Sequence, residues 1–371
     1  MFKKLLYCLI LGIILLKSSV FGQNTTLSNQ SKISIITCGS GNELYSIYGH
    51  TAIRVQDTKN NLDVVFNYGT FDFRTENFYM KFVKGDLQYF VSASSFADFM
   101  SEYIFENREV SEQNLILTTE QKQKIYDELV TSLFSDDKFY TYKFIDKNCT
   151  TMVMDKVNSL YGSALVKKNT TSNCSYRAVL YPYLKNHFFE NLGINIMFGY
   201  KTDQLATKLF LPIELLESLK TTKFKKQHIT EPVTILNPKS KNSTSFVWWN
   251  SIYAFCLVLL LLNIFQKKVI IIAYFFLFGS LGLFLSWVGF YSFHHEIAQN
   301  YNVLLFNPSL LVLLFMLALK KQKVVLNLIY LNWICLAIYT VFLCNKPDFL
   351  MMLPLIITSS LFLKKLLPSE K

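Results

Sequence analysis

The pattern of apolar and polar positions changes near residue 246. Beyond it, five apolar stretches alternate with short polar connections, and each can cross or nearly cross a hydrocarbon core of about 30 Å. They cover residues 247–265, 269–290, 303–319, 324–343 and 349–363, and the last one is short and contains Pro354. We therefore predict an all-α membrane domain of about five transmembrane helices over residues 247–365.

Alternating apolar residues before this region predict strands. They occur at residues 33–37, 51–55, 64–68 and 88–92, separated by turns rich in Gly, Asn and Asp. A capping-box sequence at residues 118–121 then precedes Ile125, Leu129 and Leu133 at four-residue spacing, which predicts a helix. A second helix is predicted to begin at Cys149.

This order of strands and helices predicts an α+β domain over residues 23–219. Residues 220–246 are rich in Lys, Thr, Ser and Asn, so we expect a tether there rather than part of a core. The N-terminus has Lys3 and Lys4, then an apolar core at residues 5–16 and small residues before position 23. That pattern is typical of a secretory signal peptide of residues 1–22, so the α+β domain is expected to be exported.

The formal net charge of +11 does not indicate a nucleic-acid partner, because it is concentrated in the connections between the apolar stretches. Residues 18–246 carry 25 basic and 23 acidic groups, whereas nine lysines lie beyond them. Eight of those nine fall in three connections on one predicted side of the membrane: Lys267, Lys268, Lys320, Lys321, Lys323, Lys364, Lys365 and Lys371. The positive-inside rule then places residues 23–246 outside and the C-terminus in the cytoplasm.

Three cysteines, Cys38, Cys149 and Cys174, belong to the exported segment, and an odd number leaves at least one thiol unpaired. Cys149 is predicted at a helix start, where backbone N–H groups and the helix dipole favour a thiolate, the nucleophilic form. A structural thiol or a disulfide is the competing interpretation. Pairing of Cys149 with either other cysteine would exclude the nucleophile, whereas Cys38 and Cys174 paired with each other, or reduced, would leave it available.

His50 is the candidate general base for such a thiol. It follows Gly49 and opens an alternating strand, which would hold its ring in a fixed place, although an edge-strand histidine that faces water has the same pattern. Asn67 and Asp72 lie in the aromatic segment 66–73 and are candidates to orient the imidazole.

Three further residues are candidates for substrate binding. Arg108 could pair with a phosphate, and His294 and His295 occupy an outer loop that could lie under the exported domain. A structural role is the simpler interpretation of the two histidines. The chain has no CxxC pair, no HExxH and no Gly-rich phosphate loop, so we expect neither a metal nor another cofactor.

Several segments taken together resemble one protein family, the Lnb-type lipoprotein N-acyltransferases of Bacteroidota. They are GNELYSIYGHTAIRV (41–55), FNYGTFDF (66–73), ENREVSEQNLILT (106–118), YKFIDKNCTT (142–151) and HHEIAQNYNVLLFNP (294–308). The resemblance implies a circularly permuted papain-like exported domain, related to NlpC/P60, in which the histidine strand precedes the cysteine helix. It implies His50 as base and Cys149 as nucleophile, and it does not identify the third catalytic group.

The resemblance also implies a reaction. Cys149 would take an acyl chain from a phospholipid as a thioester and pass it to the α-amine of the N-terminal diacylglyceryl-cysteine of a lipoprotein, at the inner (cytoplasmic) membrane. The same Cys-His pair with water as acceptor would be a membrane-anchored peptidase, amidase or phospholipase. The remaining alternative is a non-catalytic envelope sensor or assembly protein.

Overall fold

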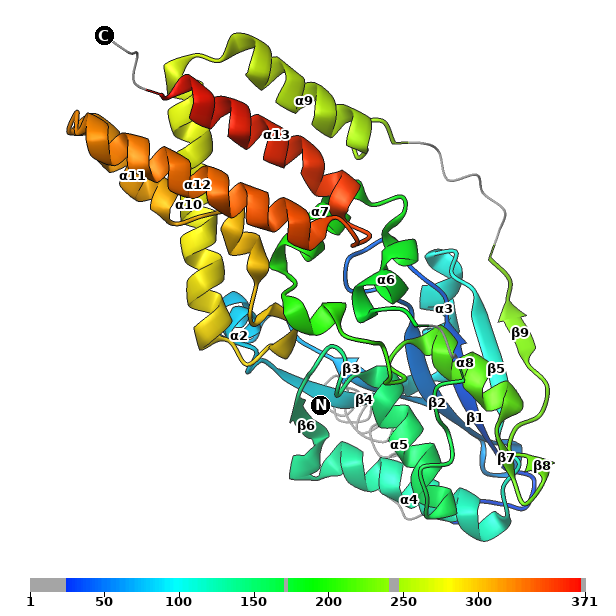
Figure 1. Ribbon diagram of the computed structural model, residues 1–371. Coiled ribbons are helices and arrows are strands. Elements are labelled where there is room, and N and C mark those ends of the chain that lie inside the picture. The colour runs from blue at the N-terminus through cyan, green and yellow to red at the C-terminus, as the bar shows by residue number, and fades with distance from the viewer. Residues whose placement is uncertain (1–24, 170–172, 240–246, 368–371) are drawn as a thin grey trace, which may run out of the picture.

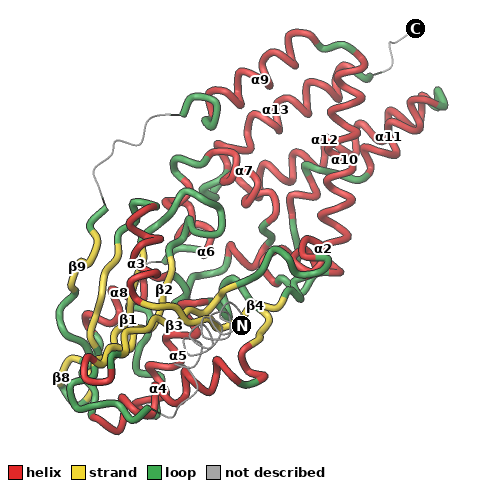
Figure 2. The backbone as a smooth tube through the Cα atoms, turned by 180° about the vertical axis from the view of Figure 1, so that it is seen from behind, coloured by secondary structure: helices red, strands yellow, loops and turns green. Residues whose placement is uncertain are grey.

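The computed structural model describes residues 25–169, 173–239 and 247–367, so the predicted signal peptide at 1–22 lies outside the described residues. The chain forms a sheet-containing domain followed by a bundle of helices (Figure 1). Seen from behind, the strands gather at one end of the molecule and the long helices at the other (Figure 2). This order agrees with the predicted succession of an α+β domain and a helical C-terminal region.

The domain is built on an antiparallel sheet with the strand order β6-β4-β3-β2-β1-β5-β9. The predicted strands are confirmed as β1 to β4, each somewhat longer than its apolar pattern. The strands are β1 (Lys32–Cys38), β2 (His50–Asp57), β3 (Leu62–Thr70), β4 (Gln88–Ser95), β5 (Val110–Asn114), β6 (Phe139–Thr141) and β9 (Thr234–Asn237).

Helices cover both faces of the sheet because alternate strand residues are apolar on each face. On one face, Ile53 and Phe66 pack with Leu129 and Val153 from two of the helices. On the other face, a smaller apolar cluster includes Phe99. The helices of this domain are α2 (Phe78–Lys84), α3 (Phe96–Phe105), α4 (Thr119–Phe134), α5 (Cys149–Tyr161), α6 (Tyr176–Leu180), α7 (Phe188–Met197) and α8 (Pro212–Thr221).

Both predicted helix starts are confirmed. The Thr118 side chain accepts a hydrogen bond from the Gln121 N–H, and the Gln121 side chain bonds back to the Thr118 backbone, which completes the capping box of α4. Asn148 and Thr151 form the same reciprocal arrangement at α5. These local hydrogen bonds place Cys149 at the first position of α5.

The segment predicted as a tether contributes to the fold up to residue 239. A small hairpin pairs β7 (Lys223–Phe224) with β8 (Gln227–His228), and β9 adds an edge strand to the sheet beside β5. Its strand pattern is weak in the sequence because β9 is partly exposed, so few of its residues need to be apolar.

The C-terminal region consists of α9 (Ile252–Phe265), α10 (Lys268–Tyr291), α11 (Ser309–Ala318), α12 (Gln322–Leu343) and α13 (Phe349–Lys365). Within the described residues, three helical segments are long and apolar enough to cross a membrane: 268–291, 295–318 and 322–343. The other two predicted spans coincide with α9, which has 14 residues, and α13, which has 17 residues and contains Pro354.

Polar contacts join the sheet-containing domain to the outer ends of the bundle. Arg177 of α6, a fully buried side chain, donates to Asp203 at 2.9 Å, and Lys346 from the α12–α13 loop donates to the same carboxylate at 2.6 Å. Asp348 lies 3.9 Å from Arg177 in the same buried cluster. The loop after α10 is also held, because the Gly199 N–H donates to the Glu296 carbonyl at 2.7 Å. The two parts therefore form one connected structure.

Candidate active site

His50 is the first residue of β2 and is fixed by the glycine before it. Gly49 has φ +85°, and a Cβ at this position would lie 2.5 Å from the Cys38 carbonyl oxygen. Only glycine fits both the backbone conformation and this close approach. Cys38 and His50 are paired residues of β1 and β2, so the backbone turn at Gly49 fixes the position from which the His50 side chain extends.

Asn67 is brought to His50 by the register of two strands. Ala52 of β2 pairs with Asn67 of β3, and His50, two residues before Ala52, lies on the same face of the sheet. His50 Nε2 and Asn67 Oδ1 are 3.1 Å apart. With an amide oxygen as the acceptor, Nε2 carries a proton, and Nδ1 is the nitrogen left to accept one from a thiol.

Cys149 reaches the same place from the start of α5. The neighbouring Thr150 hydroxyl lies 3.2 Å from that of Thr51, which ties the helix start to β2. A Cβ on Gly69, whose φ is +89°, would lie 3.8 Å from the Cys149 Cβ, so this glycine of β3 lies directly beside the cysteine. The sheet and α5 thus bring Cys149 to β2, the strand that begins with His50, although the two residues are far apart in the sequence.

The thiol and the imidazole shift each other's protonation. Burial alone would raise the pKa of Cys149, but the charge and hydrogen bond of His50, together with the Thr51 N–H and the Thr150 hydroxyl, lower it below the ordinary thiol value. Burial also lowers the pKa of His50, and the Cys149 thiolate and the hydrogen bonds to Cys149 and Asn67 outweigh it and raise that pKa. These opposite shifts favour a thiolate–imidazolium pair, the reactive form of a cysteine nucleophile.

Asp72, the second candidate for orienting the imidazole, lies elsewhere. Its carboxylate pairs with Arg74 at 2.8 Å, and Arg74 is 90% exposed. The pair lies in the loop after β3, so Asn67 and not Asp72 contacts His50.

Arg108 is only 4% exposed and packs inside the domain. Its Nε donates to the Gly39 carbonyl at 2.9 Å and its Nη1 to Glu106 at 2.9 Å. The guanidinium also lies over the Tyr103 ring. Arg108 is therefore buried within the domain, and its positive charge lowers the pKa of His50.

The two histidines of the loop after α10 lie against the sheet-containing domain. His294 Nε2 donates to the Phe82 carbonyl at 2.8 Å, and its ring packs on Gly85 just after α2. The His295 side chain is 67% exposed and lies 3.9 Å from Asp146. His294 thus joins the loop to the domain, whereas His295 stays largely open to solvent. Its contact residue, Asp146, is three positions before Cys149 in the sequence.

Two tyrosines beside Cys149 were not expected from the sequence. Tyr142 and Tyr140 both approach Gly69 on the side where Cys149 lies. Burial, followed by the negative charge of Cys149, raises the pKa of each phenol, so both remain protonated near the thiolate. The alternating aromatic run at residues 139–144, just before the cysteine, was the signal in the sequence that pointed to them.

The cysteines of the described residues are all free, so neither Cys38 nor Cys174 is bonded to Cys149. Burial raises the pKa of Cys38 to about 12, which keeps it a neutral thiol. Within the described ranges, no group of three or more His, Cys, Asp or Glu side chains is arranged to hold a metal.

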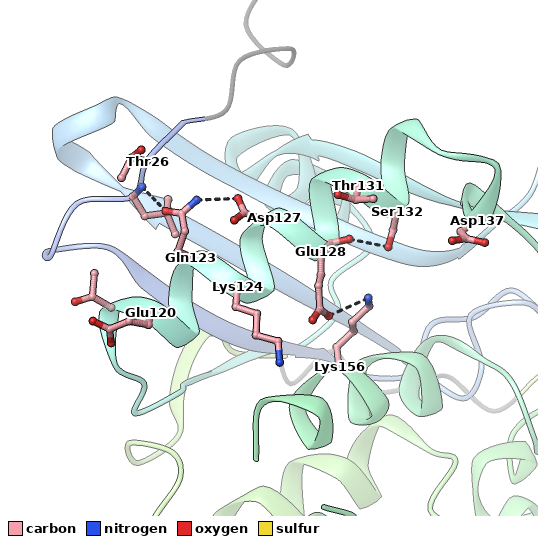
Figure 3. A pocket seen from close by; sticks show the side chains of 12 residues that line it. Thr26, Glu120, Gln123, Lys124, Asp127, Glu128, Thr131, Ser132, Asp137 and Lys156 are labelled. Atoms are coloured by element: carbon pink, nitrogen blue, oxygen red, sulfur yellow. Dashed lines mark hydrogen bonds and ion pairs between the residues drawn. The ribbon is translucent and has the colours of Figure 1, made fainter. Parts of the chain in front are cut away.

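A polar hollow elsewhere in the domain is separate from this site. Figure 3 shows it along α4, crossed by an ion pair of 3.3 Å between Lys156 and Glu128. Its lining residues include none of the candidate site residues. The hollow therefore adds no residue to the candidate site of Cys149, His50 and Asn67.

Comparison with known families matches residues 19–181 to the Lnb N-terminal periplasmic domain. The matched range contains His50, Asn67 and Cys149. Comparisons with curated proteins and with solved structures gave no match.

Proposed function

The chain belongs to the Lnb family, and on that premise we propose that it is a membrane-bound lipoprotein N-acyltransferase. It would move an acyl chain from a phospholipid, through a thioester on Cys149, to the α-amine of the N-terminal diacylglyceryl-cysteine of a lipoprotein. The observation that carries the proposal is the place of Cys149 at the start of α5, which is tied through Thr150 to β2, the strand whose His50 bonds to Asn67. This domain is joined to helices long and apolar enough to cross a membrane.

The first half-reaction forms the thioester. The Cys149 thiolate attacks the ester carbonyl carbon of the phospholipid, and the C–O bond to the glycerol oxygen breaks. The imidazolium of His50 gives its proton to that leaving oxygen, which releases a lysophospholipid. Backbone N–H groups at the start of α5 would stabilise the negative oxygen of the tetrahedral intermediate.

The second half-reaction uses the same groups in reverse. The neutral α-amine of the lipoprotein attacks the thioester carbonyl, and His50 accepts the proton that the nitrogen loses. The C–S bond breaks, the amide forms, and the thiolate–imidazolium pair returns. Asn67 keeps the ring oriented in both steps through its bond to Nε2.

The architecture suits two lipid substrates. We propose a periplasmic catalytic domain with a permuted papain-like order, because the strand with the base precedes the helix with the thiol. We further propose that α9 and α13 join the three longer segments as spans of an inner-membrane bundle, with the lysine-rich connections in the cytoplasm. Donor and acceptor would then lie in the same leaflet, next to the catalytic domain.

The test is mass spectrometry of lipoprotein N-termini from cells that lack their own N-acyltransferase, with and without this chain. We expect an amide-linked acyl chain with the wild type and its loss with Cys149→Ser and with His50→Ala. Cys174→Ser, which removes an exposed thiol of the same domain, is the matched control and should retain activity. Loss of phospholipid acyl chains without N-acylation would instead identify a phospholipase, and no change in either lipid or lipoprotein would refute the proposed acyltransferase.

A further inference from the structure

Large apolar side chains are exposed on α2 and on the turn before it. Tyr79 is 76% exposed, Phe73 62% and Met80 60%, although Phe78 between them is buried. Single exposed apolar residues are ordinary, but a contiguous group on one short helix indicates a surface that contacts something other than water. We call Phe73, Tyr79, Met80 and Phe82 the α2 surface.

The α2 surface is held at the outer end of a membrane-spanning helix. The Phe293 N–H, two residues after α10, donates to the Lys84 carbonyl at the end of α2, at 2.7 Å. The Lys84 ammonium also lies 5.7 Å from the centre of the Phe293 ring. Figure 1 shows α2 beside this end of α10. The level of α2 relative to the membrane is therefore set by α10.

The end of α10 has the composition of a membrane–water interface. Phe290 is 94% exposed, and Trp287 and Tyr291, which stack on each other at 4.7 Å, are also exposed. Aromatic residues at the end of a spanning helix lie at the level of the lipid headgroups, because their rings are apolar and their polar edges remain hydrated. The α2 surface continues this aromatic end, with Lys81 and Lys84 on the same short helix.

We propose that the α2 surface inserts into the interfacial region of the outer leaflet, so that the exported domain binds phospholipid directly as well as through its helical bundle. The occupant is the bilayer that α10 crosses, since α2 is fixed at the end of that helix. This inference does not depend on the reaction proposed above.

A series of ring contacts leads from this surface toward the thiol. Phe71 packs on Phe78 at 6.0 Å and on Tyr89 at 5.4 Å, and Tyr89 stacks on Tyr142 at 4.5 Å. Tyr142 in turn lies next to Cys149 across Gly69. If the proposed function holds, these aromatic rings form a continuous row between the α2 surface and Cys149, along which the acyl chain of a phospholipid can bind.

The experiment is photo-crosslinking of the full chain in vesicles of phosphatidylethanolamine and phosphatidylglycerol that contain an alkyne-tagged phospholipid. The photoreactive residue p-benzoylphenylalanine replaces Tyr79 or Met80, and label on the chain is measured after irradiation. Phe290 is the lipid-facing reference. Ile116, which is 55% exposed and bonds to Ile229 beside the β7–β8 hairpin far from the bundle in Figure 1, is the matched water-facing control. Every variant carries Cys149→Ala, so no label can arise from acylation of the thiol.

We expect lipid label at positions 79 and 80 within about twofold of that at position 290 and at least about fivefold above that at position 116. Label at positions 79 and 80 no higher than at position 116, with strong label at position 290, would overturn the proposal. Crosslinks between two copies of the chain in place of lipid would also overturn it, because the surface would then be an interface between copies. Since the thiol is absent throughout, the outcome is independent of whether the chain transfers acyl groups.

Discussion

Replacement of Asn67 by alanine removes the acceptor that holds the His50 ring. A hydrogen bond to a charged group contributes about 1.5–3 kcal/mol and one between neutral groups about 0.5–1.5 kcal/mol. The loss therefore costs the thiolate–imidazolium pair about 1–1.5 kcal/mol relative to the neutral thiol and imidazole. Since 1.36 kcal/mol corresponds to a factor of ten, the ratio of the ion pair to the neutral pair should fall roughly five- to tenfold.

The assay is the rate of Cys149 alkylation by iodoacetamide, followed by mass spectrometry of the Cys149 peptide from the full chain across a pH series. In the wild type the pKa of Cys149 is lowered and that of His50 is raised, and both shifts favour the ion pair over the neutral thiol and imidazole. Alkylation should begin below the ordinary thiol pKa. In Asn67→Ala the rise should move to higher pH, because thiolate formation then competes with the neutral pair.

Two controls make the result decisive. At a pH above both pKa values the thiol is ionised in both proteins, so equal alkylation there shows that the reagent reaches Cys149 equally in the two. Asp72→Asn removes a carboxylate that pairs with Arg74 in the exposed loop, and it should leave the profile unchanged. An unchanged profile in Asn67→Ala, or a shift in Asp72→Asn, would refute the assignment of the orienting group.

Three further changes have expected outcomes. His50→Ala should move Cys149 alkylation above the ordinary thiol pKa, because burial then acts without its compensating charge; alkylation still favoured near neutral pH would contradict the ion pair. Gly49→Ala should slow alkylation at pH 7 at least fivefold, because positive φ costs an L-residue about 1–2 kcal/mol and the Cβ meets a carbonyl at 2.5 Å. Gly162→Ala has similar backbone strain but nothing within 4 Å of the Cβ, so its alkylation rate should be normal. Arg177→Met leaves Lys346 as the remaining cation beside the buried Asp203 and Asp348 and should cost about 3–5 kcal/mol, seen as a lower unfolding temperature in detergent. A cost below about 1 kcal/mol would contradict the buried cluster.

Features that depend on neighbouring residues were predictable from the sequence. The start of α5 at Cys149 follows from Asn148 and Thr151, which satisfy each other's backbone groups within one turn. The strands followed from alternation, and the membrane-spanning segments from long apolar runs. The same local logic suggested His50, because a glycine before an alternating strand marks a turn into a fixed strand position.

The contacts between distant segments could not be predicted in this way. Asn67 and Asp72 are five positions apart in one aromatic segment, and nothing local distinguishes them as partners for His50. The pairing of Ala52 with Asn67 brings the amide to the imidazole, whereas Asp72 lies beyond the irregularity after Asn67 and pairs with Arg74.

The sequence by itself determined the succession of an α+β domain and apolar helices, and it offered a thiol at a helix start with a strand histidine as its candidate base. Only the tertiary structure decided that Cys149 is free, that Asn67 contacts His50, and that β9 belongs to the sheet. Periodicity and caps depend on residues within a few positions of each other. Register, ion pairing and edge-strand addition depend on which distant segments pack together, and this is set by the fold as a whole.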